Sequence, residues 1–210
     1  SILILVHHYL SQGGILLVAP FFMMNALGYS ATKMGMFIAA FSAFRMVLAP
    51  VSGRLYDRYG PRMLLIFGNF LITLALFWIS QMGLDLNDIG LFTGLLLASA
   101  GSAFFEPVVT STIMASVPSS RLGTASALVA LGRQTAFAVG VTIAGAVFAI
   151  RHRTYLAELT DLGVSIESAN RSAIASGFSD VMFVAVVFAS LAILFSSGLR
   201  NRTTRNGVFK

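Results

Sequence analysis

The chain has 210 residues, of which 57% are hydrophobic and 10% are charged, and its mean hydropathy is +0.85. A soluble domain of this length needs many more charged residues to cover its surface, so the composition excludes an ordinary soluble fold and predicts a membrane protein. The net charge of +6 comes from basic residues near the ends of apolar runs and not from one basic face, so no nucleic acid is expected as a partner.

Six apolar runs follow one another along the chain. Each is close to the ~20 residues that a helix needs to cross ~30 Å of hydrocarbon. The first run contains Gln12-Gly13-Gly14, which predicts a weak point in the middle of its helix. We therefore expect an all-α half-domain of six transmembrane helices within residues 1–199. The expected spans are 2–25, 31–55, 63–82, 89–114, 124–150 and 180–199.

A short charged segment, residues 53–62, joins the second and third runs. It contains three arginines and one aspartate, which are costly inside hydrocarbon, so we expect a tight loop in water or at the headgroups. Gly53 and Gly60 permit a tight reversal and a close approach of the helices. Pro61 suits the first position of the third helix, where its missing N–H costs nothing.

The one long connector lies between the fifth and sixth runs, at residues 151–179. We expect it to be an outer loop that carries a short amphipathic helix on the membrane surface. The helix is predicted from apolar residues at helical spacing. These residues are Tyr155, Leu156, Leu159 and Leu162. Residues 200–210 follow the last span and are expected to form a basic tail.

The basic residues predict which side of the membrane each connector faces, because Lys and Arg accumulate on the cytoplasmic side. The side of the 53–62 loop holds eight of them and the other side holds four. The eight are Arg54, Arg58, Arg62, Arg121, Arg200, Arg202, Arg205 and Lys210, and the four are Lys33, Arg151, Arg153 and Arg171. We therefore expect loop 53–62 and the C-terminal tail to be cytoplasmic.

Two groups of residues carry a resemblance to a known family. Gly53, Leu55, Asp57, Arg58, Gly60 and Arg62 match the pattern G-x-L-x-D-R-x-G-x-R. Val117-Pro118, Arg121-Leu122-Gly123, Gly132-Arg133-Gln134 and Gly140 form the second group. With these residues the chain resembles the C-terminal half of a major facilitator superfamily transporter, and most of all the fourteen-helix drug and proton antiporter branch. The resemblance covers essentially all 210 residues.

The resemblance implies a fold and an activity. The fold is one half of a major facilitator transporter, built as a 3+3 repeat, although the sequence itself shows no repeat. The activity is proton-coupled efflux of hydrophobic or cationic drugs by alternating access, without an enzymatic reaction and without a cofactor. The implied partners are the lipid bilayer, a small hydrophobic substrate, protons and the N-terminal half of the same transporter. The implied location is a bacterial inner membrane.

Two alternatives to drug efflux remain open. One is a facilitator or symporter of a specific metabolite, which has the same fold but the opposite coupling. The fifth helix also departs from the antiporter motif of the family, since it has Gly140-Val141 and not the Gly-Pro pair typical of the N-terminal half. The other is a truncated half that does not transport, because one half lacks part of the cavity. Proton flux with and without a drug would separate the first alternative from antiport.

The 53–62 segment also predicts a conformational latch, formed by Gly53, Asp57, Arg58, Gly60 and Arg62. Asp57 can pair with nearby arginines or face the positive end of another helix. Such a contact can form in one conformation and break in another. The alternative is a solvated turn that only enforces the topology.

Three ionisable residues fall inside the expected spans, and an intramembrane charge is a functional hypothesis. They are Arg45, Glu106 and Arg133. Burial disfavours the charged form of Glu106 and a nearby arginine favours it, so a change of conformation could switch its protonation. Gln134 and Gln12 are expected to join them along a pathway for protons and substrate. The alternative is an internal salt bridge, or arginines that reach the headgroups.

Other chemistry finds little support in the sequence. His7 and His8 could relay protons, but adjacent residues point about 100° apart on a helix, so they do not form a joint site. The chain has no cysteine, which excludes disulfides and thiolate metal sites. No phosphate loop, metal cluster or pair of nucleophile and base stands out. We therefore expect no metal and no catalytic residue.

Overall fold

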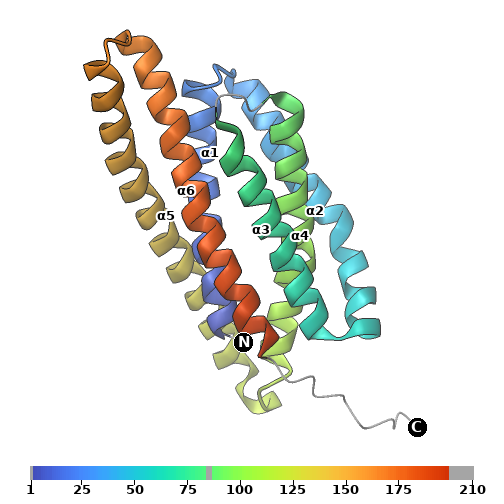
Figure 1. The fold of residues 1–210 in the computed structure, drawn as a ribbon. Helices are drawn as coiled ribbons and strands as arrows, with labels where there is room; N and C mark the ends of the chain where they lie inside the picture. The colour runs from blue at the N-terminus through green and yellow to red at the C-terminus, as the bar shows by residue number, and fades with distance from the viewer. Residues whose placement is uncertain (1, 84–86, 199–210) are drawn as a thin grey trace.

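The computed structural model describes residues 2–83 and 87–198, and its secondary structure there is helical (Figure 1). Six helices are long and apolar enough to cross a membrane. They are α1 (Ile2–Asn25), α2 (Ala31–Tyr59), α3 (Pro61–Met82), α4 (Asp88–Met114), α5 (Leu122–Asp161) and α6 (Ile166–Ser197), with the short 3-10 helix η2 (Ser119–Arg121) before α5. Each expected apolar run corresponds to one of these helices. The predicted all-α bundle is confirmed.

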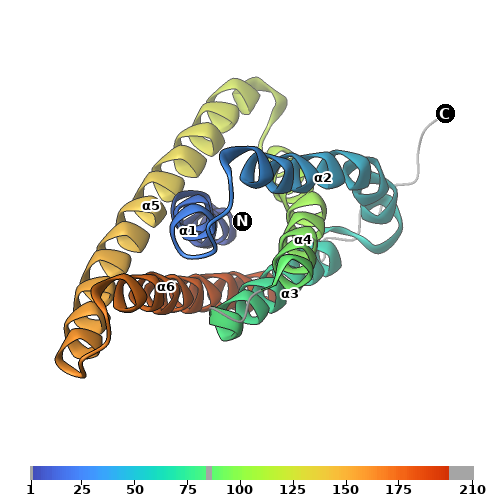
Figure 2. The same cartoon turned by 90° about the horizontal axis from the view of Figure 1, so that it is seen from above.

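The packing of the helices relates the first three to the last three. Seen from above, α1 lies inside the bundle, between α5 and the pair α3 and α4 (Figure 2). It packs chiefly against α5 and α6, as α4 packs against α2 and α3, and α3 packs against α6. Exchanging α1, α2 and α3 with α4, α5 and α6 therefore reproduces the main contacts. This is the relation expected of a 3+3 repeat, which the sequence did not show.

The two halves of this repeat differ at α2. Helices α5 and α6 pack against each other along much of their length, whereas α2 and α3 barely touch. No residue in the most apolar stretch of α2 is buried within the chain, and Ser52 is its one buried residue. Helix α2 is instead tied to α4, where the Ser99 hydroxyl donates to the Phe41 carbonyl at 2.6 Å. Most of the surface of α2 therefore stays free for contacts outside this chain.

Glycines set the closest helix contacts. A Cβ on Gly140 of α5 would lie 2.4 Å from the Leu10 carbonyl oxygen of α1, and a Cβ on Gly13 would lie 2.5 Å from the Val141 nitrogen. Lipid is as apolar as the side chains, so helices in a bilayer associate through such close packing and not through burial of apolar surface. The prediction of a weak point at Gly13 is therefore wrong. Gly13 lies inside a continuous helix and packs against the backbone of α5.

The expected loop at residues 53–62 needs a second correction. Helix α2 continues to Tyr59 and α3 starts at Pro61, so Gly60 alone lies between them. Gly60 has a positive φ of 78°, and its N–H donates to the Tyr56 carbonyl at 2.9 Å. Residues 54–59 contain no proline and no glycine, so nothing ends the helix where the charges begin.

The connector at residues 151–179 is also different from the prediction. Helix α5 runs on to Asp161 and α6 begins at Ile166, so only residues 162–165 join them. The helix predicted from the spacing of the apolar residues is present, but it extends α5 instead of forming a separate surface helix. The Arg151 guanidinium, which donates to Asp180 of α6 at 2.5 Å, ties the two extensions together. The tail at residues 200–210 lies outside the described residues.

Candidate functional site

A cavity of about 280 Å³ lies between α1, α2 and α4, and Phe137 of α5 contributes to its wall. Most of the wall is aliphatic or aromatic, as in sites that bind apolar small molecules. Its polar side chains come from three helices. The polar and charged residues of the wall are Tyr9, Gln12, Ser42, Arg45 and Glu106.

An ion pair crosses this cavity from α2 to α4. The Arg45 Nη1 donates to Glu106 Oε1 at 2.8 Å. The Arg45 side chain is 42% exposed and that of Glu106 is 26% exposed, so both face open space inside the bundle. Pro107 follows Glu106 within α4, and a proline weakens the hydrogen bonding of the turn before it. The carboxylate is thus held by one arginine at a deformable point of its helix.

The positions of both partners follow from local structure. The Asn87 side chain caps the start of α4 by accepting from the Gly90 N–H at 2.7 Å. Farther along α4, Gly101 lies so close to Gly68 of α3 that a Cβ there would be 2.5 Å from the Gly68 carbonyl oxygen. This contact fixes the level of Glu106 against the rest of the bundle.

Gln12 joins α1 to the same site. Its Nε2 donates to the Ser102 hydroxyl of α4 at 2.7 Å, and its side chain lines the cavity. Ser102 lies one helical turn before Glu106, so the two polar contacts of α4 share a face. Gln12, Arg45 and Glu106 are therefore brought together, from three different helices.

Arg133 and Gln134 lie on α5 and are exposed, and neither lines the cavity. Both share a helix face with Phe137, which does line it. The predicted set of pathway residues therefore divides into three that line the cavity and two on the neighbouring face of α5.

Two residues at the site were not among the predicted pathway residues. Tyr9 lines the cavity, and its place three residues before Gln12 on the same helix face could have revealed it. His8, the next residue back, is fully buried behind the wall and stacks on Phe105 with ring centroids 3.9 Å apart. The sequence predicted that the two adjacent histidines do not form a joint site. In the structure His7 instead bonds to the Leu3 carbonyl.

The predicted latch residues gather where α2 meets α3, well away from the cavity. Gly53, Asp57 and Arg58 lie in the last turns of α2, Gly60 joins the helices and Arg62 lies in the first turn of α3. Asp57 is exposed, and no residue of the described part of the chain forms an ion pair with it. Arg58 lies 5.4 Å from the ring centroid of Tyr59. If Asp57 acts as a latch, its charged partner therefore lies outside the described residues of this chain.

A polar cluster joins α2 and α4 at the opposite end. The Tyr29 hydroxyl donates to Asp88, and Lys33 Nζ lies 2.6 Å from the second oxygen of that carboxylate. Lys33 also lies 3.7 Å from the centroid of the Tyr29 ring. Desolvation, and then the hydrogen bond to Asp88, raise the pKa of Tyr29 above its ordinary value, so its hydroxyl stays a donor at neutral pH. Within residues 2–83 and 87–198, no cluster of three His, Asp or Glu could hold a metal ion.

Comparison with known proteins gives one family and several relatives. A family model described as Major Facilitator Superfamily matches residues 2–194. The multidrug resistance protein Stp of Mycobacterium tuberculosis is 29% identical over 136 residues, which cover 65% of this chain and 25% of Stp. The multidrug export protein EmrB of Escherichia coli is 25% identical over 156 residues, 73% of this chain and 30% of EmrB. The lincomycin resistance protein LmrB of Listeria innocua is 20% identical over 185 residues, 88% of this chain and 39% of LmrB.

Proposed function

Because the chain belongs to the major facilitator superfamily, we propose that it forms the C-terminal half of a secondary transporter that exports hydrophobic or cationic compounds in exchange for protons. The chain is an integral membrane protein with six spanning helices. Its matches cover 25 to 39% of the length of the relatives named above. The activity proposed therefore belongs to a complete transporter that contains this chain.

The observation that carries the proposal is the Arg45–Glu106 ion pair in the wall of an apolar cavity. In such surroundings the carboxylate stays charged only while a cation is near. A proton, the Arg45 guanidinium and a cationic substrate can each neutralise it, so they compete. When a proton occupies Glu106 the ion pair is lost, and α2 is then held to α4 by fewer polar contacts. Protonation can thus be coupled to a movement of α2.

The partner that we propose for this movement is an N-terminal half of the transporter. Helices α2 and α5 both expose most of their surface within this chain, and α2 and α5 occupy equivalent places in the repeat. These faces are the natural contact for an N-terminal half, which would close the cavity. The apolar outer surfaces of the remaining helices would face lipid.

The same comparison supports a proposed membrane location. The relatives that the chain matches are bacterial, which favours a bacterial inner membrane. The excess of basic residues favours a cytoplasmic position for residues 53–62 and for the C-terminal tail.

An efflux assay on the complete transporter tests the proposal. Membrane vesicles with an imposed proton gradient would be loaded with a fluorescent cationic drug. Glu106→Gln is expected to reduce gradient-driven transport to the level of vesicles without transporter, because an amide cannot exchange a proton. The matched control is Glu158→Gln, an exposed carboxylate outside the cavity, which is expected to transport normally. Full proton-coupled transport by the Glu106→Gln protein would refute the proposal.

A further inference from the structure

The side chain of His8 lies in the interior of the bundle, directly behind the cavity wall. It is 0% exposed, and Phe105 of α4 stacks on its ring. Its Nδ1 lies 3.3 Å from Oδ1 of Asn69 on α3. Its other nitrogen, Nε2, is buried and has no hydrogen-bond partner in the described part of the chain.

The contacts of Asn69 determine which nitrogen of His8 carries the hydrogen. The Asn69 Nδ2 donates to the Leu65 carbonyl oxygen at 3.1 Å, and a carbonyl can only accept. The Asn69 Oδ1 therefore faces His8 and accepts a hydrogen from its Nδ1. A neutral ring with hydrogen on Nδ1 leaves a bare lone pair on Nε2. A buried acceptor without a donor is rare and calls for an explanation.

Charged and titratable groups surround His8 on several helices. Tyr9 follows it on α1, and their rings meet edge to face at 5.1 Å. Arg45 of α2 and Glu106 of α4 line the cavity together with Tyr9, and Arg133 lies on the neighbouring face of α5. Helix α3 supplies the uncharged Asn69. On α6 the group at this level is Phe195, which meets His7 at 5.0 Å, and the charged residues of that helix lie toward its opposite end.

We propose that Nε2 of His8 is a second proton-binding site of the transporter, closed off behind Glu106 in this conformation. The inference rests on the proposed function. In the conformation described, both sites are without a proton, since Glu106 pairs with Arg45 and Nε2 is bare. In the transfer, the O–H bond of the Glu106 carboxylic acid breaks and an N–H bond forms on Nε2, with cavity water as the carrier. The carboxylate left behind pairs with Arg45, as observed.

The access of water to His8 depends on the seam between α1 and α4. Helix α1 packs chiefly on α5 and α6, and its contact with α4 is small. The Gln12–Ser102 hydrogen bond closes this seam one turn away from His8. Tyr9 and Glu106, the residues that follow His8 and Phe105, both line the cavity. A small separation of the two helices would therefore open a path from the cavity to Nε2.

Nitrogen NMR of the complete transporter, labelled with ¹⁵N-histidine, tests the site directly. The signals of His8 would be assigned by elimination, with His7→Gln and His152→Gln proteins in which any histidines outside this chain have first been replaced, so the assignment does not require a His8 variant that folds. We expect a bare nitrogen at high pH, which becomes an N–H nitrogen as the pH falls through the range where transport changes. A Nε2 signal that stays unprotonated over this range, with and without drug, would overturn the inference.

Transport measurements give a second readout. His8→Gln is expected to keep drug exchange across the membrane but to lose its response to the proton gradient, whereas His7→Gln is expected to behave as the unmodified protein. An unchanged pH profile in the His8→Gln protein would count against the site. Failure of the unmodified protein to export drugs would refute the proposed function, whereas the NMR titration still decides whether His8 binds a proton.

Discussion

Charge inside the bundle is concentrated at one ion pair. The described residues form three ion pairs. Lys33–Asp88 lies at the starts of α2 and α4, and Arg151–Asp180 lies at the edges of the expected spans 124–150 and 180–199. Arg45 and Glu106 form the third within the membrane-spanning part of the bundle, where an unpaired charge is most costly. At the residue scale, this pair and the uncharged His8 behind it hold the chemistry. Asp57 differs, because it is exposed and unpaired in the described chain.

Asp57→Asn tests whether this exposed carboxylate acts as a latch. The change removes a charge from the end of α2 without altering its size. We expect gradient-driven transport to fall severalfold while the amount of protein in the membrane stays the same, because the side chain forms no ion pair among the described residues that the change would break. The measurement is transport per molecule of inserted protein.

The control for the latch is Asp161→Asn at the far end of α5, where the aspartate also lies exposed. This variant is expected to transport normally. If Asp57→Asn transported as well as the control, the segment would only enforce topology.

The helices differ in the kind of contact that holds them in the bundle. Helix α1 is fastened to α5 by direct backbone contact at Gly13 and Gly140. Helix α2 is fastened to α4 through side chains, by polar contacts at Lys33, Phe41 and Arg45 and by the packing of Phe37 on Phe92. Packed backbones resist movement, and single polar contacts can be broken and remade. At the element scale, we therefore expect α1 and α5 to move together and α2 to be the more readily displaced helix.

Gly140→Ala tests the packing of α1 on α5. Its Cβ would lie 2.4 Å from a backbone oxygen of α1, so the helices must separate. We expect a loss of about 1–3 kcal/mol of stability, typical of overpacking. Thermal unfolding of the purified protein in detergent would measure it. Gly132→Ala on the same helix is the control, since its Cβ would meet only a leucine side chain at 3.8 Å. Equal stability of the two variants would contradict the packing argument.

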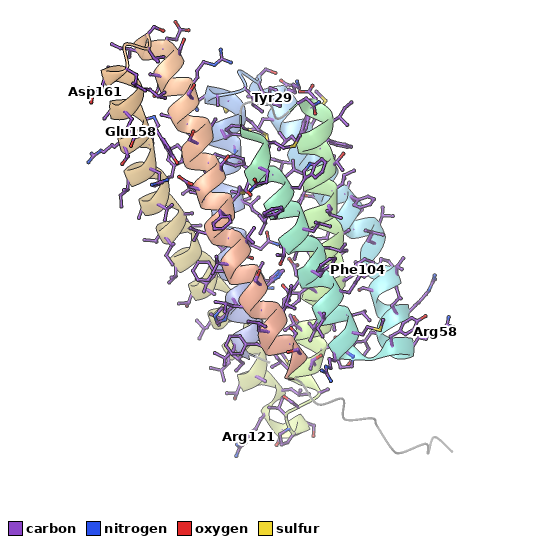
Figure 3. The ribbon with its side chains drawn as sticks, in the orientation of Figure 1. Tyr29, Arg58, Phe104, Arg121, Glu158 and Asp161 are labelled. Carbon is purple, nitrogen blue, oxygen red and sulfur yellow. The ribbon has the colours of Figure 1, made fainter. Side chains whose placement is uncertain are left out.

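The whole molecule has two distinct ends. Arg58 and Arg121 lie at one end, and Tyr29, Glu158 and Asp161 lie at the other (Figure 3). Helices α5 and α6 extend beyond the other helices at the second end (Figure 1). Successive connectors therefore lie at alternate ends, as the two groups of basic residues require. The first end, which has more basic residues, is predicted to be cytoplasmic.

Cysteine labelling tests this orientation, because the chain has no cysteine of its own. Leu162→Cys, in the turn between α5 and α6, is expected to react with a membrane-impermeant maleimide in intact cells. Ser120→Cys, in the turn before α5, is expected to react only after the membrane is opened. Any other cysteines of the complete transporter would first be replaced. The reverse pattern of labelling would invert the proposed orientation.

Several features of the fold were readable from the sequence because they depend on residues close together in the chain. Asn25 and Asn87 mark the end of α1 and the start of α4, where apolar runs meet polar residues. The ends of α2 and α5 were missed, because a helix need not stop where the hydrocarbon does. Residues 54–59 and 151–161 are rich in charged and polar residues but contain no proline or glycine, so the helices continue into water.

The sequence predicted which residues belong to the site, but not which of them contact one another. The sequence singled out Arg45, Glu106 and Arg133 and left an internal salt bridge open, without saying which arginine would form it. The structure pairs Glu106 with Arg45, which lies 61 positions away, and leaves Arg133 on the exposed face of α5. His8 was not expected to form a joint site with His7, because adjacent residues point about 100° apart on a helix. Nothing in the neighbouring sequence predicts its contacts with Asn69 and Phe105.

The sequence alone therefore determined the class of protein, the six spans and the residues able to carry charge within them, since the thickness of the bilayer makes apolar length a property of one segment at a time. Only the tertiary structure decided which helices form the cavity, which arginine holds Glu106 and which nitrogen of His8 stays bare. Those facts depend on how helices distant in sequence pack, and that packing is set by glycine contacts and polar contacts that no single helix contains.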